Sequence, residues 1–99
     1  MRTRTFEVFT GSTKGLRFDV IDAEGNVVNA SNAVAKLYDS NMSLISTLEL
    51  VNDSTGVFKT SIDTTVLSLS AGKYIIEFSC IANGNTYKRR DYLLVSDFV

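Results

Sequence analysis

The sequence contains no histidine, no proline and no tryptophan, and only one of its 99 residues is a cysteine. Histidine is the most common general base and metal ligand of proteins, so its absence removes the usual starting point for either kind of site. A single cysteine cannot form an internal disulfide, and nothing here favours an oxidising compartment. Cys80 lies in an apolar run and is interpreted as a small core side chain.

A strong charge bias and long apolar segments are missing as well. Ten Lys and Arg residues against 11 Asp and Glu residues give a formal charge of -1, so no long-range field attracts nucleic acid or an anionic membrane. No segment approaches the roughly 18 apolar residues of a membrane span. The N-terminal residues also lack the apolar run of a secretory signal. We expect a single soluble domain over residues 1–99, made in the cytoplasm.

What the sequence does contain is apolar and polar residues in alternation, without helical spacing over any convincing length. This pattern predicts an all-β chain of about seven strands, with turn signals every roughly 8 to 12 residues as in a sandwich or small barrel. Residues 73–82 have apolar side chains on both faces and are expected to form a central strand. The expected strands cover residues 3–9, 16–21, 33–38, 44–50, 57–62, 73–82 and 86–95.

Several short segments carry turn signals. Gly25 and Asn26 tolerate the positive φ that tight turns need, and residues 52–56 are interpreted as a second turn. Residues 64–72 are expected to pass from one sheet to the other, with a single helical turn. Asn83-Gly84 is a strong signal for a two-residue hairpin turn.

The acidic residues do not form a convincing catalytic or metal-binding pattern. Asp19 with Asp22, and Asp53 with Asp63, are the pairs that general acid–base chemistry would require, but turn aspartates commonly bond local backbone amides. The oxygen-rich turns do not match the spacing of a calcium-binding loop. We therefore expect no enzyme activity, no metal site and no cofactor.

Three consecutive cations occupy the last expected strand. Alternation would place Lys88 and Arg90 on one face with Tyr92, and Arg89 on the other. The three cations then form no single patch, and they fall short of the about 6 to 10 phosphate contacts of dedicated DNA binders. Two interpretations stay open: solvated cations that pair across strands with residues such as Glu77, or a protein interface, where Arg and Tyr are enriched.

The edges and ends of the expected sheet are further candidates for contacts. No proline blunts an edge strand, so a neighbouring chain could pair with one, unless Arg2, Arg4 and Glu7 protect the first strand. Phe98 and Val99 form an apolar end with no strand left to join. The expected interface residues are Lys88, Arg90, Tyr92, Phe98, Val99, Arg2 and Arg4.

Three phrases of the chain resemble bacterial and phage immunoglobulin-like domains, and together they span about residues 15–95. They are VIDAEGNVV at 20–28, DSTGVFKT at 53–60, and LSAGKYIIEF at 69–78 with the following YKRRDYLLV. The resemblance implies an immunoglobulin-like antiparallel β-sandwich.

Single domains of this kind, without a signal peptide or a cysteine pair, resemble small virion proteins of tailed bacteriophages. The resemblance implies a non-enzymatic structural protein: a head decoration protein, a neck or tail adaptor, or a baseplate accessory. Its expected partners are capsid, neck or tail proteins and itself as a homo-oligomer, with no nucleic acid and no membrane. The expected location is the virion, after assembly in the host cytoplasm. The alternative is a carbohydrate- or receptor-binding module that uses exposed aromatics such as Tyr38 and Tyr87.

Overall fold

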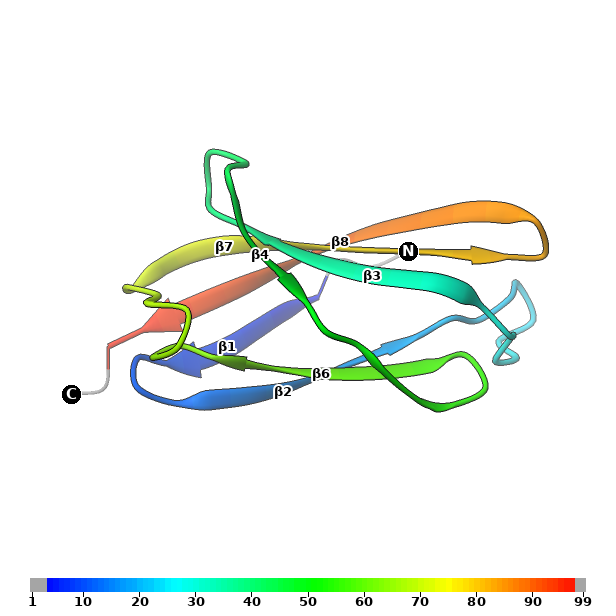
Figure 1. The fold of residues 1–99 in the computed structure, drawn as a ribbon, viewed down its shortest axis with the longest axis horizontal. Coiled ribbons are helices and arrows are strands. Elements are labelled where there is room, and N and C mark those ends of the chain that lie inside the picture. Colours follow the sequence, from blue (N-terminus) through cyan, green and yellow to red (C-terminus); the bar gives the residue numbers. More distant parts are fainter. Residues whose placement is uncertain (1–3, 98–99) are drawn as a thin grey trace.

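Eight strands form two facing sheets in the computed structural model of the protein, which describes residues 4–97 (Figure 1). The chain is an all-β, immunoglobulin-like sandwich, as its alternation and the resemblance predict. The strands are β1 (Thr5–Phe9), β2 (Thr13–Asp19), β3 (Ser31–Tyr38), β4 (Leu44–Leu48), β5 (Val51–Ser54), β6 (Val57–Asp63), β7 (Gly72–Ala82) and β8 (Asn85–Ser96).

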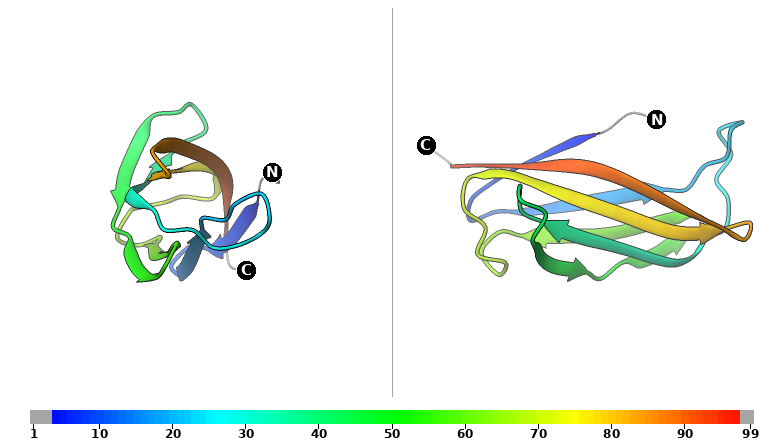
Figure 2. Two further views of the ribbon diagram at one scale, coloured as in Figure 1. Left: turned by 90° about the vertical axis from the view of Figure 1, so that its right-hand side faces the viewer. Right: turned by 90° about the horizontal axis from the view of Figure 1, so that it is seen from above.

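The two sheets differ in size, and the view along the sandwich in Figure 2 shows them wrapped around one interior. The larger sheet has the order β1-β8-β7-β3-β4, and the smaller has the order β2-β6-β5. Strand β7 is central, as expected, because it pairs with β8 on one side and β3 on the other. Strand β1 runs parallel to β8, from Thr5 opposite Tyr92 to Phe9 opposite Ser96. The sheets are therefore mostly, but not wholly, antiparallel.

Strand β5 is the element that the sequence did not predict. Residues 52–56 were expected to form a turn, but Val51–Ser54 pairs with β6 and the turn is confined to Thr55 and Gly56. All four residues of β5 are exposed, so the strand buries no side chain and shows no alternation. Strand β2 also begins earlier than expected, at Thr13, because its first residues pair with the end of β6.

The turns follow the predicted chemistry in most places. Asn83 and Gly84 have φ of 52° and 77°, as a two-residue hairpin turn requires. Gly25 has φ of 85°, whereas Asn26 does not have positive φ; its N–H instead donates to Asp22 Oδ1 at 2.9 Å. The segment between β6 and β7 crosses from the small sheet to the large one, and a 3.0 Å bond from the Leu67 N–H to the Asp63 carbonyl forms a single turn.

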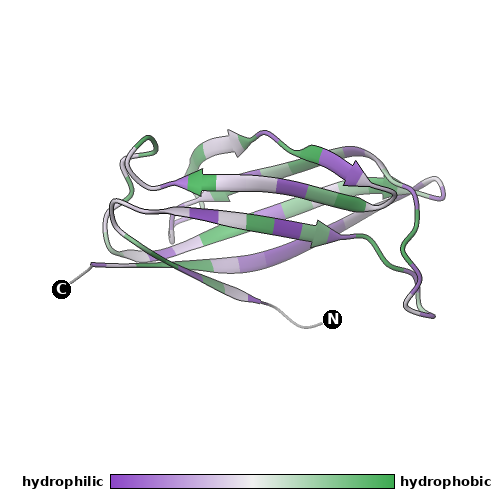
Figure 3. Ribbon diagram, turned by 90° about the horizontal axis from the view of Figure 1, so that it is seen from below, coloured by the Kyte–Doolittle hydropathy of each residue, from purple (hydrophilic) through white to green (hydrophobic). Residues whose placement is uncertain are grey.

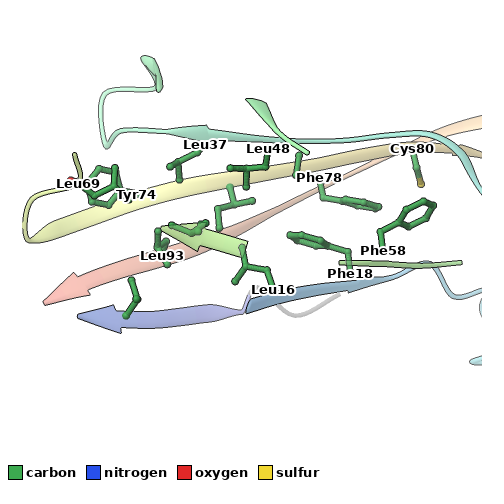
Figure 4. Packing of buried hydrophobic residues seen from close by; sticks show 14 of the residues in the cluster. Leu16, Phe18, Leu37, Leu48, Phe58, Leu69, Tyr74, Phe78, Cys80 and Leu93 are labelled. Carbon is green, nitrogen blue, oxygen red and sulfur yellow. The ribbon is translucent and has the colours of Figure 1, made fainter. Parts of the chain in front are cut away.

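Aromatic rings hold the middle of the sandwich together (Figure 4). Phe18 of β2 and Phe78 of β7 stack across the two sheets, with centroids 4.8 Å apart and planes within 5°. Phe58 of β6 packs beside them, at 6.0 Å from Phe78. Hydropathy alternates along the strands, as Figure 3 shows. In β8 the inward residues Leu93 and Val95 are fully buried, whereas Leu94 between them points outward and is 37% exposed.

Candidate functional site

The outer face of the five-stranded sheet carries Lys88, Arg90 and Tyr92, three of the seven residues expected at an interface. Cross-strand pairing aligns Tyr38, Ile75 and Tyr92 in one row, from β3 through β7 to β8. Their side chains alternate with buried neighbours and therefore point away from the core. Next to this row on the same face is the exposed Leu94. We call this surface the outer face.

Cations surround the apolar row. Lys36 and Arg90 flank Glu77 in the adjacent row, and Arg90 Nε donates to Glu77 Oε2 at 3.0 Å, a cross-strand pair of the kind the sequence suggests. Lys73 Nζ lies over the Tyr92 ring, 4.1 Å from its centroid. The charged side chains of the outer face are Lys36, Lys73, Lys88, Arg90, Glu7 and Glu77. Cations therefore outnumber carboxylates here, although the whole chain has a formal charge of -1.

The exposed side of the three-stranded sheet has a different character. Its cations are paired with acids on the same sheet: Arg17 Nε lies 2.8 Å from Asp19 Oδ1, and Lys59 Nζ lies 3.1 Å from Asp53 Oδ2. The pairs are exposed, and such pairs contribute about 0 to 1 kcal/mol each. This side resembles an ordinary solvated surface, and it provides a control for experiments on the outer face.

Asp91 is a buried carboxylate that joins the first and last strands. Its side chain is 1% exposed, and its Oδ1 accepts from the Arg4 backbone N–H at 2.9 Å and from Arg89 Nε at 3.1 Å. The Arg4 guanidinium lies 3.5 Å from Asp91 Oδ2, donates to the Arg17 carbonyl, and covers the Phe6 ring at 4.8 Å. The cluster fixes β1 onto β8 and has a structural role.

The structure brings together only some of the predicted interface residues. Lys88, Arg90 and Tyr92 share the outer face, while Arg89 turns inward as alternation predicts. Arg4 lies in the Asp91 cluster instead of on that face. The remaining three, Arg2, Phe98 and Val99, lie outside the described residues.

The sequence indicates Tyr38 only as an exposed aromatic side chain, and nothing in it shows that Tyr38, Ile75 and Lys73 share a face with Tyr92. Alternation puts Ile75 opposite the buried face of its strand, but its alignment with Tyr38 and Tyr92 depends on the pairing of three strands. Alternation alone gives the side of each residue and says nothing of its neighbours across strands. No signal in the sequence identifies Asp91 as buried. It directly follows three consecutive cations, and such a charged stretch is typical of an exposed surface.

Residues 4–97 contain neither a cluster of metal-ligating side chains nor a membrane-spanning helix. The described part of the chain has no group of three or more Cys, Asp or Glu side chains placed to hold a metal ion. It also has no helix that is long and apolar enough to cross a membrane.

Cys80 offers a test of how tightly the interior is closed. It is 2% exposed, and burial raises the pKa of its thiol. We expect Ellman's reagent to label the folded protein at least about 100-fold more slowly than the urea-unfolded chain at pH 8, because the exposed thiolate is the reactive form. Equal labelling rates would contradict the buried position.

The same raised pKa gives a pH dependence with a defined sign. Folding favours the neutral thiol, so its stabilising contribution is present below the ordinary value of 9.0 and is lost as the pH rises through the higher value of the folded state. The free energy of unfolding should therefore fall more steeply above about pH 9 in the parent protein than in Cys80→Ala.

Comparisons with known proteins find similar folds in two solved structures. No family model matches the sequence, and no curated protein matches it either. Part of an endo-β-1,4-mannanase from Thermotoga petrophila has a similar structure, with a TM-score of 0.66, 17% identity, 98% of this chain covered and 18% of the mannanase. A DUF4785 family protein from Legionella pneumophila has a TM-score of 0.61 and 13% identity, over 96% of this chain and 27% of that protein.

These similarities are to small parts of larger proteins. The chain spans 18% of the mannanase and 27% of the Legionella pneumophila protein. At such low identity the likeness shows the fold alone, because one fold hosts many unrelated functions.

Proposed function

We propose that this chain is a non-enzymatic structural domain that acts through protein–protein contacts made by the outer face of the five-stranded sheet. The observation that carries the proposal is the row of Tyr38, Ile75 and Tyr92 bordered by cations, on a molecule whose other sheet is covered by internally paired charges. Aromatic residues and arginine are enriched in protein interfaces. The excess of cations favours a partner with an acidic surface.

The more specific part of the proposal is a place in the virion of a tailed bacteriophage, as a head decoration protein, a neck or tail adaptor, or a baseplate accessory. Its support is the resemblance of residues 15–95 to phage immunoglobulin-like domains. The partners would be capsid, neck or tail proteins, and further copies of the chain. The direct test is mass spectrometry of purified particles that carry this gene. Particles that lack the chain would remove the virion assignment and leave the contact surface open to other partners.

Charge reversal separates the outer face from the rest of the surface. We expect Lys73→Glu with Arg90→Glu to reduce incorporation into particles at least about tenfold, because like charges then face an acidic partner. The matched control is Arg17→Glu with Lys59→Glu on the other sheet, which changes the net charge equally and also breaks two exposed ion pairs.

Each variant combines two surface changes of about 0.5 kcal/mol or less, so both should keep the circular dichroism spectrum of the parent and a melting temperature within about 8 °C of it. If incorporation falls equally in the two variants, the effect is due to net charge, and this result would contradict a specific contact by the outer face. Unchanged incorporation in both would leave Lys73 and Arg90 as solvated strand positions.

The second candidate is a carbohydrate-binding module. It is favoured by the aromatic side chains of Tyr38 and Tyr92, which lie in one row on the outer face, and the mannanase suggests mannan as the glycan to test. Against it, Lys73 already covers one face of the Tyr92 ring, where a sugar would stack. Affinity electrophoresis in gels containing mannan tests it: retarded migration that is lost in Tyr38→Ala would support a glycan site, and unchanged migration would remove it.

A further inference from the structure

The long β7–β8 hairpin extends past the small sheet at one end of the sandwich. Strands β7 and β8 contain 11 and 12 residues, whereas β2 ends at Asp19 and the chain leaves that sheet. Residues 20–28 then form a loop at the hairpin end, as both Figure 1 and the right panel of Figure 2 show. Among the described strands, none of the small sheet covers the inner side of the hairpin tip, so a space remains between the tip and the loop.

This space is a mostly apolar cavity of about 160 Å³. We call it the end pocket. Its deep part is formed by Phe78, Cys80 and Ala82 of β7, with Val20 and Val28 from the loop side. The three β7 side chains are at most 6% exposed, so the cavity reaches the edge of the core. Its volume is similar to that of an apolar engineered cavity of about 150 Å³ that binds benzene.

The mouth of the end pocket is apolar and unusually exposed. Ile21 is 55% exposed and Tyr87 is 49% exposed, and both line the pocket. Val27, which pairs with Ile21 through an isolated bridge, is 46% exposed. Tyr87 has the inward parity of its strand and is exposed because the opposite sheet has already ended. Exposed apolar groups around a pocket are typical of interaction sites.

Most charges around the end pocket are already bonded within the chain. Arg89 Nε donates to Asp91, Asp19 pairs with Arg17, and Asp22 Oδ1 accepts the N–H groups of Glu24 and Asn26 at 3.0 and 2.9 Å. These groups therefore offer little to a charged ligand. A neutral group fits the cavity best, and the ring of Phe78 and the thiol of Cys80 favour an aromatic one.

We propose that the end pocket receives an aromatic side chain from a protein partner. A ring fills a cavity of this size, but it cannot also cover Ile21, Val27 and Tyr87 at the mouth; a protein segment would cover all three. A buried aromatic anchor surrounded by a rim of contacts is the usual arrangement of an interface hot spot. The end pocket is separate from the outer face and does not depend on the function proposed for that face.

The test is an NMR titration of the intact chain with N-acetyl-tryptophanamide, with N-acetyl-alaninamide as the control. We expect backbone amide shifts confined to Val28, Cys80 and Ala82 and their neighbours, with a Kd of about 1 mM, as befits a single side chain. The alanine compound should cause no shifts at the same concentration. Shifts that are absent, or equal with both compounds, would overturn the proposal.

Two variants and one further probe complete the design. Ala82→Leu fills the cavity and should abolish binding; because it could also disturb the fold, Tyr87→Ser at the exposed mouth is tested in parallel and should weaken binding at least about threefold. Tyr38→Ser, on the outer face, is the matched control and should bind normally. Free indole is the third probe. Binding of indole without binding of the amide would assign the pocket to a free small molecule, against the proposed protein side chain.

Discussion

Asp91→Ala is expected to lower the free energy of unfolding by about 3 kcal/mol, because removing one partner of a buried ionic cluster leaves uncompensated charge. The Asp91 side chain is 1% exposed, while those of its partners Arg4 and Arg89 are 38% and 23% exposed. This partial exposure places the effect at the low end of the range for buried pairs. Urea unfolding, followed by circular dichroism, measures it as a lower midpoint.

The cluster depends on Asp91 as its shared acceptor. Arg4 Nε is already buried without a hydrogen-bond partner among residues 4–97. Asp91→Asn should lose less stability than Asp91→Ala, because the amide oxygen of asparagine can still accept the hydrogen bond from the Arg4 backbone N–H. The control is Asp19→Ala, which breaks an exposed pair and should change stability by about 0.5 kcal/mol or less. An Asp91→Ala variant as stable as this control would show that the cluster contributes nothing to folding.

Gly56→Ala is also expected to lower the free energy of unfolding by about 3 kcal/mol, because backbone strain and steric overlap act together. Gly56 has φ of 69°, and an added Cβ would press on the Val28 carbonyl oxygen and a methyl group of Val27. Gly56 also accepts a hydrogen bond from the Val20 N–H at 2.8 Å. This glycine therefore lets the turn before β6 lie directly against the loop that forms one wall of the end pocket.

Gly84→Ala separates the two causes. Gly84 also has positive φ, 77°, but an added Cβ there would meet nothing within 4 Å. Gly84→Ala should therefore lower the free energy of unfolding by only about 1 kcal/mol, because backbone conformation is the only cause. Both variants are compared by chemical and thermal unfolding. If the two variants lose equal stability, the close contact between Gly56 and the loop does not contribute to the loss.

Local patterns in the sequence predict much of the fold. Alternation identifies the buried faces of β2, β7 and β8, and Asn83-Gly84 identifies the hairpin turn, because both signals act over a few residues. Strand β5 escapes this reasoning because it is exposed throughout and held only by its backbone bonds to β6. The parallel pairing of β1 with β8 is equally invisible, since it joins the two ends of the chain.

The candidate sites divide in the same way. Strand parity alone correctly separates Lys88 and Arg90 from Arg89, because side chains alternate between the two faces of a strand. The burial of Asp91 depends on Arg4, which lies 87 positions away, and a run of three cations followed by an aspartate gives no hint of it. The end pocket depends on β2 ending before the hairpin does, which is a matter of relative strand length in three dimensions.

The parallel contact between β1 and β8 has a mechanical consequence. Tension applied between Thr5 and Ser96 would pull the two strands along their length in opposite directions, because the first residue of β1 and the last of β8 lie at opposite ends of the contact. The hydrogen bonds between them would then share the load in shear and break together, whereas a hairpin pulled open from its ends yields one bond at a time. The Asp91 cluster lies at the start of the same contact and ties it further. The domain is thus built to resist stretching from end to end.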